Sequence, residues 1–322
     1  MKPGNPIGAG EAISPTDRQP FFTPDDQPLI RQRPMHYYKD IIFQKPLPKE
    51  IRRLGLLPAD LHFHTRHSDS ATRVRDALKL AARQGIGLAI TDHNQASGVV
   101  EARGQKINVP LVPGIEVSAN DGPHILLYFY SVSDLLDFYR RHIEKNRRNG
   151  PFTAIRLSTP EILERREDYS CIAAEAHPCG YAFLNRGVER CVAGACIGEE
   201  VFSRLDALEV ICGGMARSHN LKAAGLAVAH GLGRTGGTDG HLLHELGGVV
   251  TCAEADTVEE LLDAVRMKNT VVIGRERPLV EKAVMGTAVL PHHLPYAIPI
   301  LQARWEQSLP RIRKFVRSRL NG

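Results

Sequence analysis

Side chains that could bind metal ions recur along the chain in short motifs, and most stand at or just beyond the end of an apolar run. Such runs are typical of buried strands, and barrel enzymes gather catalytic side chains at strand ends from distant parts of the sequence. The residues that share this placement are His62, His64, Asp69, His93, Glu116, His124, His177, Asp239 and His241. Their combination predicts a site that binds several metal ions.

The motif Asp-Leu-His-Phe-His-Thr places His62 and His64 two positions apart. On a strand both imidazoles then point to the same face and can reach one ion. A buried histidine bonded to a backbone carbonyl is the alternative for either residue. Asp239, at the end of another run, could instead cap the next helix, but capping does not explain His241 two residues later.

Glu116 lies in an apolar run, residues 111–117, where an unpaired carboxylate would be costly to desolvate. No lysine or arginine stands beside it in the sequence. We therefore expect Glu116 to bridge two cations, with an ion pair to a remote arginine as the alternative. Imidazole and carboxylate donors together suit Zn, Mn or Fe better than Mg or Ca, whose shells are nearly all oxygen.

The elements that must position these side chains are short apolar runs that alternate with helical segments. The runs are residues 56–63, 87–91, 111–117, 125–130, 171–176, 207–212 and 234–238. Seven such runs predict an α/β domain built as a barrel. The turn sequence at residues 120–123 stands where a helix should connect two runs, so we expect the barrel to be distorted.

Composition predicts three regions along the chain. Residues 1–50 are rich in Pro, Gly, Gln and Asp and predict an irregular N-terminal arm. Residues 51–278 form the predicted barrel, and residues 279–322 form a C-terminal tail with a basic helix. No stretch of about 18 apolar residues and no secretory apolar core occurs, so we expect a cytoplasmic protein without membrane contact.

Taken together, these motifs resemble those of the PHP family, named for polymerase and histidinol phosphatase domains. The resemblance covers about residues 57–275 and includes Ile-Thr-Asp-His, Gly-Ile-Glu-Val-Ser, Ala-His-Pro and Gly-Gly-Thr-Asp-Gly-His. It implies a distorted (β/α)7 barrel with a trinuclear metal site, and together with the donor types we expect two or three divalent transition-metal ions, Mn, Fe or Zn. It assigns the first ion to His62, His64, Glu116 and Asp239, the second to Glu116, His124 and His177, and the third to Asp69, His93 and His241.

The resemblance also implies a stand-alone phosphoesterase, because no polymerase, ligase or nucleotidyltransferase motif accompanies the domain. Paired cations would activate a water and clamp the phosphoryl oxygens. We expect catalytic roles for Glu116, Asp239, His241 and His67, and substrate contacts from Arg186 and Asn220. His67 could protonate the leaving group, with an exposed loop histidine as the alternative, and Arg186 could equally be a surface arginine.

The expected substrate is a nucleotide or another small phosphate mono- or diester. The net charge of +5 is mild, but basic residues cluster at 140–148 and 311–319. Solvated helix faces are their ordinary role, whereas guidance of short RNA or DNA would make the chain a 5'-3' exonuclease.

A metal-dependent amidohydrolase also begins with His-x-His, but usually bridges its metals through a modified lysine rather than a residue such as Glu116.

A non-catalytic metal-binding module is disfavoured, because all nine positions that the resemblance requires are filled. The sequence does not predict an oligomeric state.

Overall fold

The computed structural model describes residues 39–150, 152–180 and 187–320. The chain divides into two compact units, Met1–Lys39 and Asp40–Gly322, and every helix and strand described below belongs to the second. Only the last part of the predicted N-terminal arm is described. It contains strand β1 (Ile41–Ile42) and the start of helix α1 (Pro48–Arg53).

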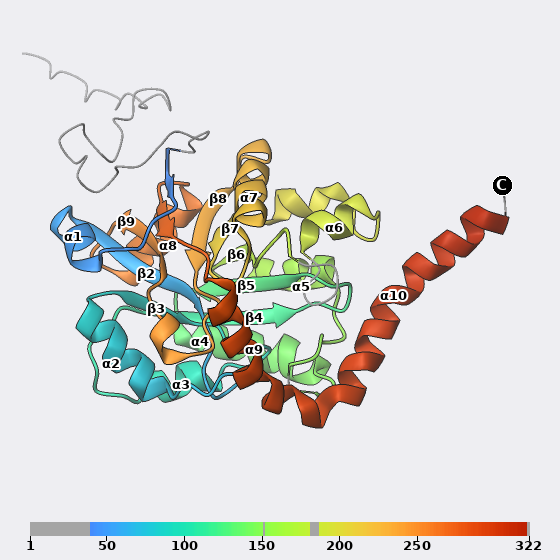
Figure 1. Cartoon of the computed structure of the whole chain (residues 1–322), viewed down its shortest axis with the longest axis horizontal. Coiled ribbons are helices and arrows are strands. Elements are labelled where there is room, and N and C mark those ends of the chain that lie inside the picture. Colours follow the sequence, from blue (N-terminus) through green and yellow to red (C-terminus); the bar gives the residue numbers. More distant parts are fainter. Residues whose placement is uncertain (1–38, 151, 181–186, 321–322) are drawn as a thin grey trace, which may run out of the picture. The chain divides into compact units, whose positions relative to one another are not determined.

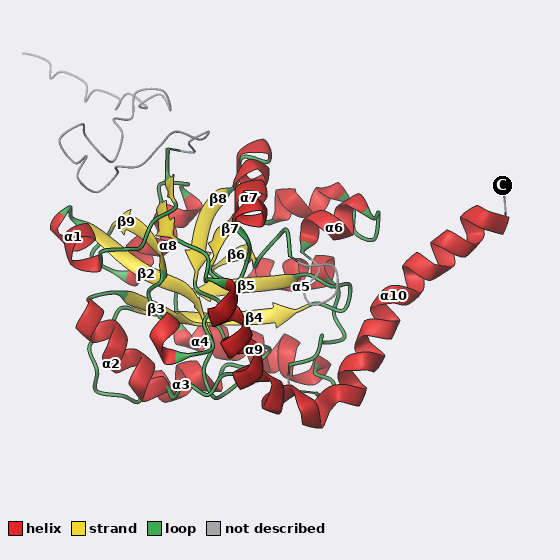
Figure 2. Cartoon of the chain, viewed as in Figure 1, coloured by secondary structure: helices red, strands yellow, loops and turns green. Residues whose placement is uncertain are grey.

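The described strands form a single sheet with the order β1-β10-β9-β2-β3-β4-β5-β6-β7-β8. Figure 2 draws strands as yellow arrows and labels β2 to β9. Its other strands are β2 (Leu56–Phe63), β3 (Gly87–Ile90), β4 (Leu111–Ser118), β5 (His124–Phe129), β6 (Cys171–Glu175), β7 (Ala207–Cys212), β8 (Gly233–Gly237), β9 (Val249–Glu254) and β10 (Val271–Gly274). All seven predicted strands are present, as β2 to β8, and the α/β fold is confirmed. Strands β9 and β10, which extend the sheet beyond β2, were not predicted.

Strand directions explain the distortion of the barrel. Strands β2, β3 and β4 pair in parallel, as do β6, β7 and β8. Between these groups β5 is antiparallel to both β4 and β6. The turn at residues 120–123 therefore reverses the chain directly from β4 to β5, as the sequence predicted, and no crossover helix lies between them.

The sheet curls until β8 lies against β2, although the two strands stand far apart in the sheet order. The backbone N–H of Asp239 donates to His62 O over 2.8 Å, and His64 N–H donates to Gly240 O over 2.9 Å. Gly237 permits this approach, because a Cβ at that position would overlap the backbone of His62. Closure of the sheet thus brings the first and last metal-binding motifs together.

Helices surround the curled sheet (Figure 1). The remaining α-helices are α2 (Val74–Gln84), α3 (Ser97–Arg103), α4 (Val132–Phe138), α5 (Thr159–Arg165), α6 (Val188–Ala193), α7 (Arg217–Ala229), α8 (Val258–Arg266), α9 (Leu279–His293) and α10 (Ala297–Leu320). Helix α8 begins with a capping box, in which Thr257 and Glu260 bond to each other's backbone N–H. It buries Leu261, Leu262 and Val265 in the apolar core that lines the strands.

Helices α9 and α10 form the helical C-terminal tail, coloured red in Figure 1. The tail was predicted from residue 279, where α9 begins. Among the described residues, none of the helices combines the length and apolar character that crossing a bilayer requires.

We expect Gly237→Ala to lower the free energy of unfolding by roughly 1–3 kcal/mol, the usual cost of forcing extra volume into a packed interior. The added methyl group would meet the His62 backbone, which cannot rotate aside. Urea unfolding of the metal-free protein measures the effect. Gly286→Ala in α9 is the control, because its added Cβ meets no atom within 4 Å. Equal stability of the two variants would contradict the close approach of β8 to β2.

Candidate metal centre

The structure brings all nine candidate metal ligands into one cluster at the ends of the strands. His62 lies on β2, Glu116 on β4 and His124 on β5. The other six follow strand ends: His64 and Asp69 after β2, His93 after β3, His177 after β6, and Asp239 and His241 after β8. The cluster can be described as three neighbouring groups that share residues.

The first group contains His62, His64 and Asp239, whose nearest donor atoms all lie within 4.8 Å of one another. Asp239 Oδ1 lies 3.5 Å from His62 Nε2 and 3.3 Å from His64 Nε2. Glu116 Oε2 approaches the same two nitrogens at 3.4 and 3.3 Å. Two imidazoles and two carboxylates therefore converge on one point.

The second group is arranged around the other oxygen of Glu116. Its Oε1 lies 2.9 Å from His124 Nδ1 and 3.2 Å from His177 Nε2. One carboxylate thus faces two separate sets of imidazoles, one through each oxygen. This is the geometry expected of a carboxylate that bridges two cations.

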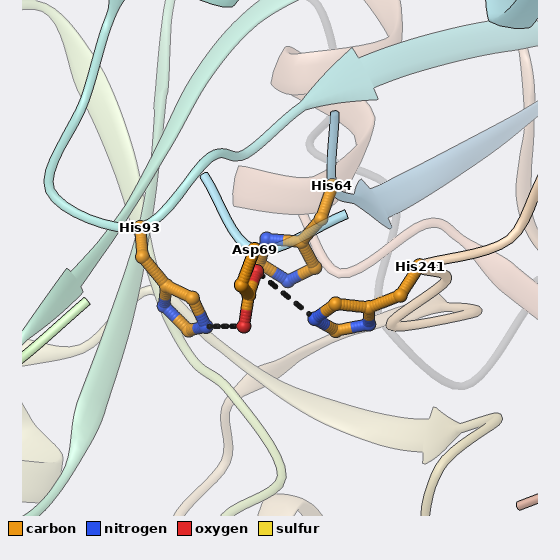
Figure 3. Close-up of side chains that lie close together, drawn as sticks. All are labelled: His64, Asp69, His93 and His241. Carbon is orange, nitrogen blue, oxygen red and sulfur yellow. Dashed lines mark ion pairs between the residues drawn. The ribbon is translucent and has the colours of Figure 1, made fainter. Parts of the chain in front are cut away.

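The third group contains Asp69, His93 and His241, with His64 beside them (Figure 3). Asp69 Oδ1 lies 3.2 Å from His241 Nε2, and Oδ2 lies 3.7 Å from His93 Nε2. His93 also turns Nδ1 towards Glu116 Oε2, at 2.9 Å. The third group is therefore joined to the first two through His93 and Glu116.

Two carboxylate oxygens of the cluster fit cations, because they are buried without a hydrogen bond. These are Asp69 Oδ1 and Glu116 Oε2, and such burial costs about 1–3 kcal/mol for each group. His62 Nε2 and His64 Nε2 face each other across 3.1 Å. A cation between them would satisfy both lone pairs, and a set of nitrogens and oxygens suits a transition metal.

Burial and the neighbouring charged groups set the protonation of the cluster. Burial, with the positive charges of His241 and His93, lowers the pKa of His64 to about 4, so this imidazole is neutral at pH 7. Burial acts to raise the pKa of Glu116, but the imidazoles of His93 and His62 hold it well below its usual range. Burial acts to lower the pKa of His93, but Glu116 and Asp69 raise it to about 9, so a cation that binds this imidazole would displace a proton.

Two of the candidate ligands have strained backbones. His177 has φ of +33° and Asp239 has φ of +50°, a region that residues other than glycine seldom adopt. Each stands just after a strand, β6 or β8, where the chain turns sharply. Strain of this kind persists where the surrounding structure enforces it, and it is concentrated at functional sites.

Glu209 on β7 orients two of these residues, a role the sequence did not reveal. It is 1% exposed, and its Oε1 lies 2.9 Å from His62 Nδ1 while Oε2 accepts from His177 N–H over 2.8 Å. A carboxylate behind a metal-binding imidazole fixes its tautomer and orientation. The sequence does contain an indication, since Glu209 is a lone carboxylate in an apolar strand, just as Glu116 is.

Two further buried carboxylates hold the loops that carry the ligands. Asp60 accepts from the backbone N–H and hydroxyl of Thr238, at 3.0 and 2.7 Å, and so ties β2 to the end of β8. Burial raises the pKa of Asp60 to about 6 in spite of these donors. Asp92 accepts from the backbone and hydroxyl of Thr65, both at 2.7 Å, and so fixes the loop that leads to Asp69.

Two of the remaining predicted residues, His67 and Asn220, bond to groups outside the nine ligands. His67 places Nε2 2.7 Å from Glu101 Oε2 and Nδ1 2.9 Å from Ser97 Oγ. Asn220 is buried, and its amide group bonds at both ends to the backbone of Cys212, at 3.1 and 3.2 Å. Arg186 lies outside the described residues.

Replacing Glu209 with Gln should weaken metal binding by roughly 10–100-fold, the usual effect of losing a partner behind a metal ligand. The amide keeps the volume but no longer offers a carboxylate to both His62 and the N–H of His177. Titration against a metal-binding dye measures the change. Glu254→Gln, at an exposed site on β9, is the control and should bind metal normally. Unchanged affinity in Glu209→Gln would exclude this role.

Comparison with known proteins is consistent with this geometry. A 3',5'-nucleoside bisphosphate phosphatase from Chromobacterium violaceum is 40% identical over 68 residues, which are 20% of this chain and 24% of that protein. A two-domain protein from Bacteroides vulgatus, described as containing a predicted PHP-like metal-dependent phosphoesterase, has a TM-score of 0.51 at 14% identity, over 73% of this chain and 68% of its own. The lesion-specific endonuclease of Pyrococcus furiosus has a TM-score of 0.51 at 17% identity, over 67% and 57%.

The two solved structures show a shared fold, because their sequence identities are low. Family models match two segments of the chain: residues 60–192 match the PHP domain, and residues 217–270 match the PHP-associated region. The first segment contains seven of the nine clustered residues, from His62 to His177, and the second contains Asp239 and His241. Residues 60–192 of the chain are therefore a PHP domain, and residues 217–270 are a PHP-associated region.

Proposed function

We propose that the chain is a metal-dependent phosphoesterase that hydrolyses a phosphate mono- or diester of a nucleotide or another small molecule. The observation that carries this proposal is the buried carboxylate of Glu116, which faces one set of imidazoles through Oε1 and another through Oε2. A bridging carboxylate of this kind belongs to paired cations, which when bound would lower the pKa of a water and neutralise phosphoryl oxygens.

The proposed ligand sets follow the three groups of the cluster, with two or three Mn, Fe or Zn ions. The first ion would be held by His62, His64, Glu116 and Asp239, the second by Glu116, His124 and His177, and the third by Asp69, His93 and His241. In this assignment Glu116 is shared by two ions, so its loss would affect both.

Exposure indicates the side from which a substrate would approach. The side chains of His62, His64 and Glu116 are 0% exposed and form the floor of the cluster. Those of Asp239 and His124 are 13% and 16% exposed and form its rim. We therefore place the phosphate at the rim, where Asp239 and His241 would border it.

His67 stays the candidate for protonating the leaving group. Its Nε2 lies 2.7 Å from Glu101 Oε2, and its side chain is 24% exposed, so it is open to solvent. Asn220 would act on the backbone of Cys212 at the end of β7 rather than on the substrate. Arg186 remains a proposed contact for the substrate phosphate.

A small ester is favoured over a nucleic acid for two reasons. The curated relative is named for a nucleoside bisphosphate, which is a small phosphate ester. In addition, part of the basic stretch at 140–148 is already paired: Arg141 contacts Asp137 and Arg148 contacts Glu306. Exposed Arg140 and Lys145 are the side chains there that could still guide a short oligonucleotide.

The function is tested by phosphate release from mononucleotides, nucleoside bisphosphates, sugar phosphates and short oligonucleotides, with Mn, Fe or Zn added. Glu116→Gln keeps the volume but removes the shared charge. We expect this variant to lose more than the roughly 10–100-fold in activity that loss of a partner outside the metal shell costs. It should also lose bound metal, which elemental analysis measures. Full metal content with near-normal turnover would show that Glu116 is only an ion-pair partner.

Salt dependence separates the small-ester proposal from the nuclease alternative. Affinity for a nucleic acid falls as the salt concentration rises. In a plot of log affinity against log salt, each neutralised phosphate of a single strand makes the slope more negative by about 0.7. We expect hydrolysis of small esters to depend weakly on salt and to be unchanged by Arg140→Glu with Lys145→Glu. Oligonucleotide hydrolysis that exceeds small-ester hydrolysis and is lost in this double variant would instead favour the exonuclease.

A further inference from the structure

A tenth residue reaches the metal centre from the C-terminal tail. His293, the last residue of α9, places Nε2 3.1 Å from Asp69 Oδ2. Its side chain is 30% exposed, whereas that of Asp69 is 4% exposed. His293 lies beyond both segments that match the family models, because the second of them ends at residue 270. The family comparison therefore assigns it no role.

The two oxygens of Asp69 have different surroundings. Oδ1 is buried without a hydrogen-bond partner and faces His241, whose Nε2 lies 3.2 Å away. Oδ2 accepts a hydrogen bond from His293. Figure 3 shows the carboxylate between His93 and His241, with one oxygen turned to each. A carboxylate that binds a cation through one oxygen is commonly held by a hydrogen bond to the other.

The imidazole of His293 is itself held in place by aromatic contacts. The ring of Phe152 lies 5.3 Å from it at an angle of 53°, and Tyr296 packs edge-on against Phe152 at 5.8 Å. The neighbouring Thr153 accepts a hydrogen bond from Asn94 Nδ2 over 3.1 Å. Because Asn94 directly follows His93, this packing links the α9–α10 turn to a loop of the metal centre.

Contacts on both sides of this turn fix the C-terminal helices. Lys282 Nζ donates to the backbone oxygen of Met215 over 3.0 Å near the start of α9. Glu306 of α10 forms an ion pair with Arg148, and Ala303 of α10 is 5% exposed. The tail is therefore packed on the barrel on either side of His293, and the position of the imidazole is defined.

We propose that His293 is a positioning residue for the third ion: it donates from Nε2 to Asp69 Oδ2 and leaves Oδ1 to bind the metal. Its role parallels that of Glu209 behind His62. Glu209 accepts a hydrogen bond from its ligand, whereas His293 donates one to Asp69. The inference rests on the proposed function only in assuming that the cluster binds metal. The C-terminal tail would then complete the metal centre.

Three variants of the full chain test this role. His293→Leu removes the donor, and we expect the most weakly bound ion to lose roughly 10–100-fold in affinity. His293→Gln keeps an N–H donor at a similar reach and should retain most of that affinity. His292→Leu, one residue earlier on α9, should bind metal normally. Metal content after dialysis against graded chelator concentrations, with the visible spectrum of cobalt-loaded protein, reports binding without any assay of activity.

A double-mutant cycle distinguishes positioning of Asp69 from a general structural role. In an Asp69→Ala background His293→Leu should cause no further loss of metal, because the bond it removes is already absent. A further loss in that background, or equal losses for His293→Leu and His293→Gln, would overturn the proposal. A protein that binds metal as described yet cleaves no phosphate ester would refute the proposed function and leave this inference supported.

Discussion

The carboxylate of Glu116 is the group on which the rest of the site depends. It is fully buried, and its two oxygens face imidazoles from β2, β5 and the loops after β3 and β6. Without its charge His62, His64, His93, His124 and His177 would each lose a carboxylate partner. Burial acts to raise the pKa of Glu116, but the imidazoles of His93 and His62 hold it well below its usual range. The carboxylate is therefore ionised and attracts cations. One negative charge thus joins all three ligand groups.

The backbone departs from regular geometry where the cluster requires it. Between Asp60 and Phe63 the register of β2 against β3 shifts, so β2 carries one residue more than its neighbour in the stretch that contains His62. His177 and Asp239 adopt positive φ where their strands end. Gly237 lets β8 approach β2. Each irregularity lies at or beside a ligand, and the packed sheet and helices supply the stability that holds it there.

Around the ligands lies a second layer of polar groups that differ in charge and origin. Glu209 and Asp60 come from strands, and His293 comes from the C-terminal helix. Each uses its hydrogen bonds to fix a ligand or the loop that carries it. This layer leaves the rim at Asp239 and His124 open, so rigidity on the inner side coexists with access for a phosphate on the outer side.

Local spacing in the sequence was enough to predict strands β2 to β8, each to within one residue at either end, and to select nine side chains that the fold gathers into one cluster. Apolar runs and alternating side chains are properties of neighbouring residues, so they can be read before folding. Strands β9 and β10, the bond from Glu209 to His62 and the bond from His293 to Asp69 could not be read in this way. The last pair is separated by 224 residues, and only closure of the sheet and docking of the C-terminal helices bring such residues within hydrogen-bonding distance.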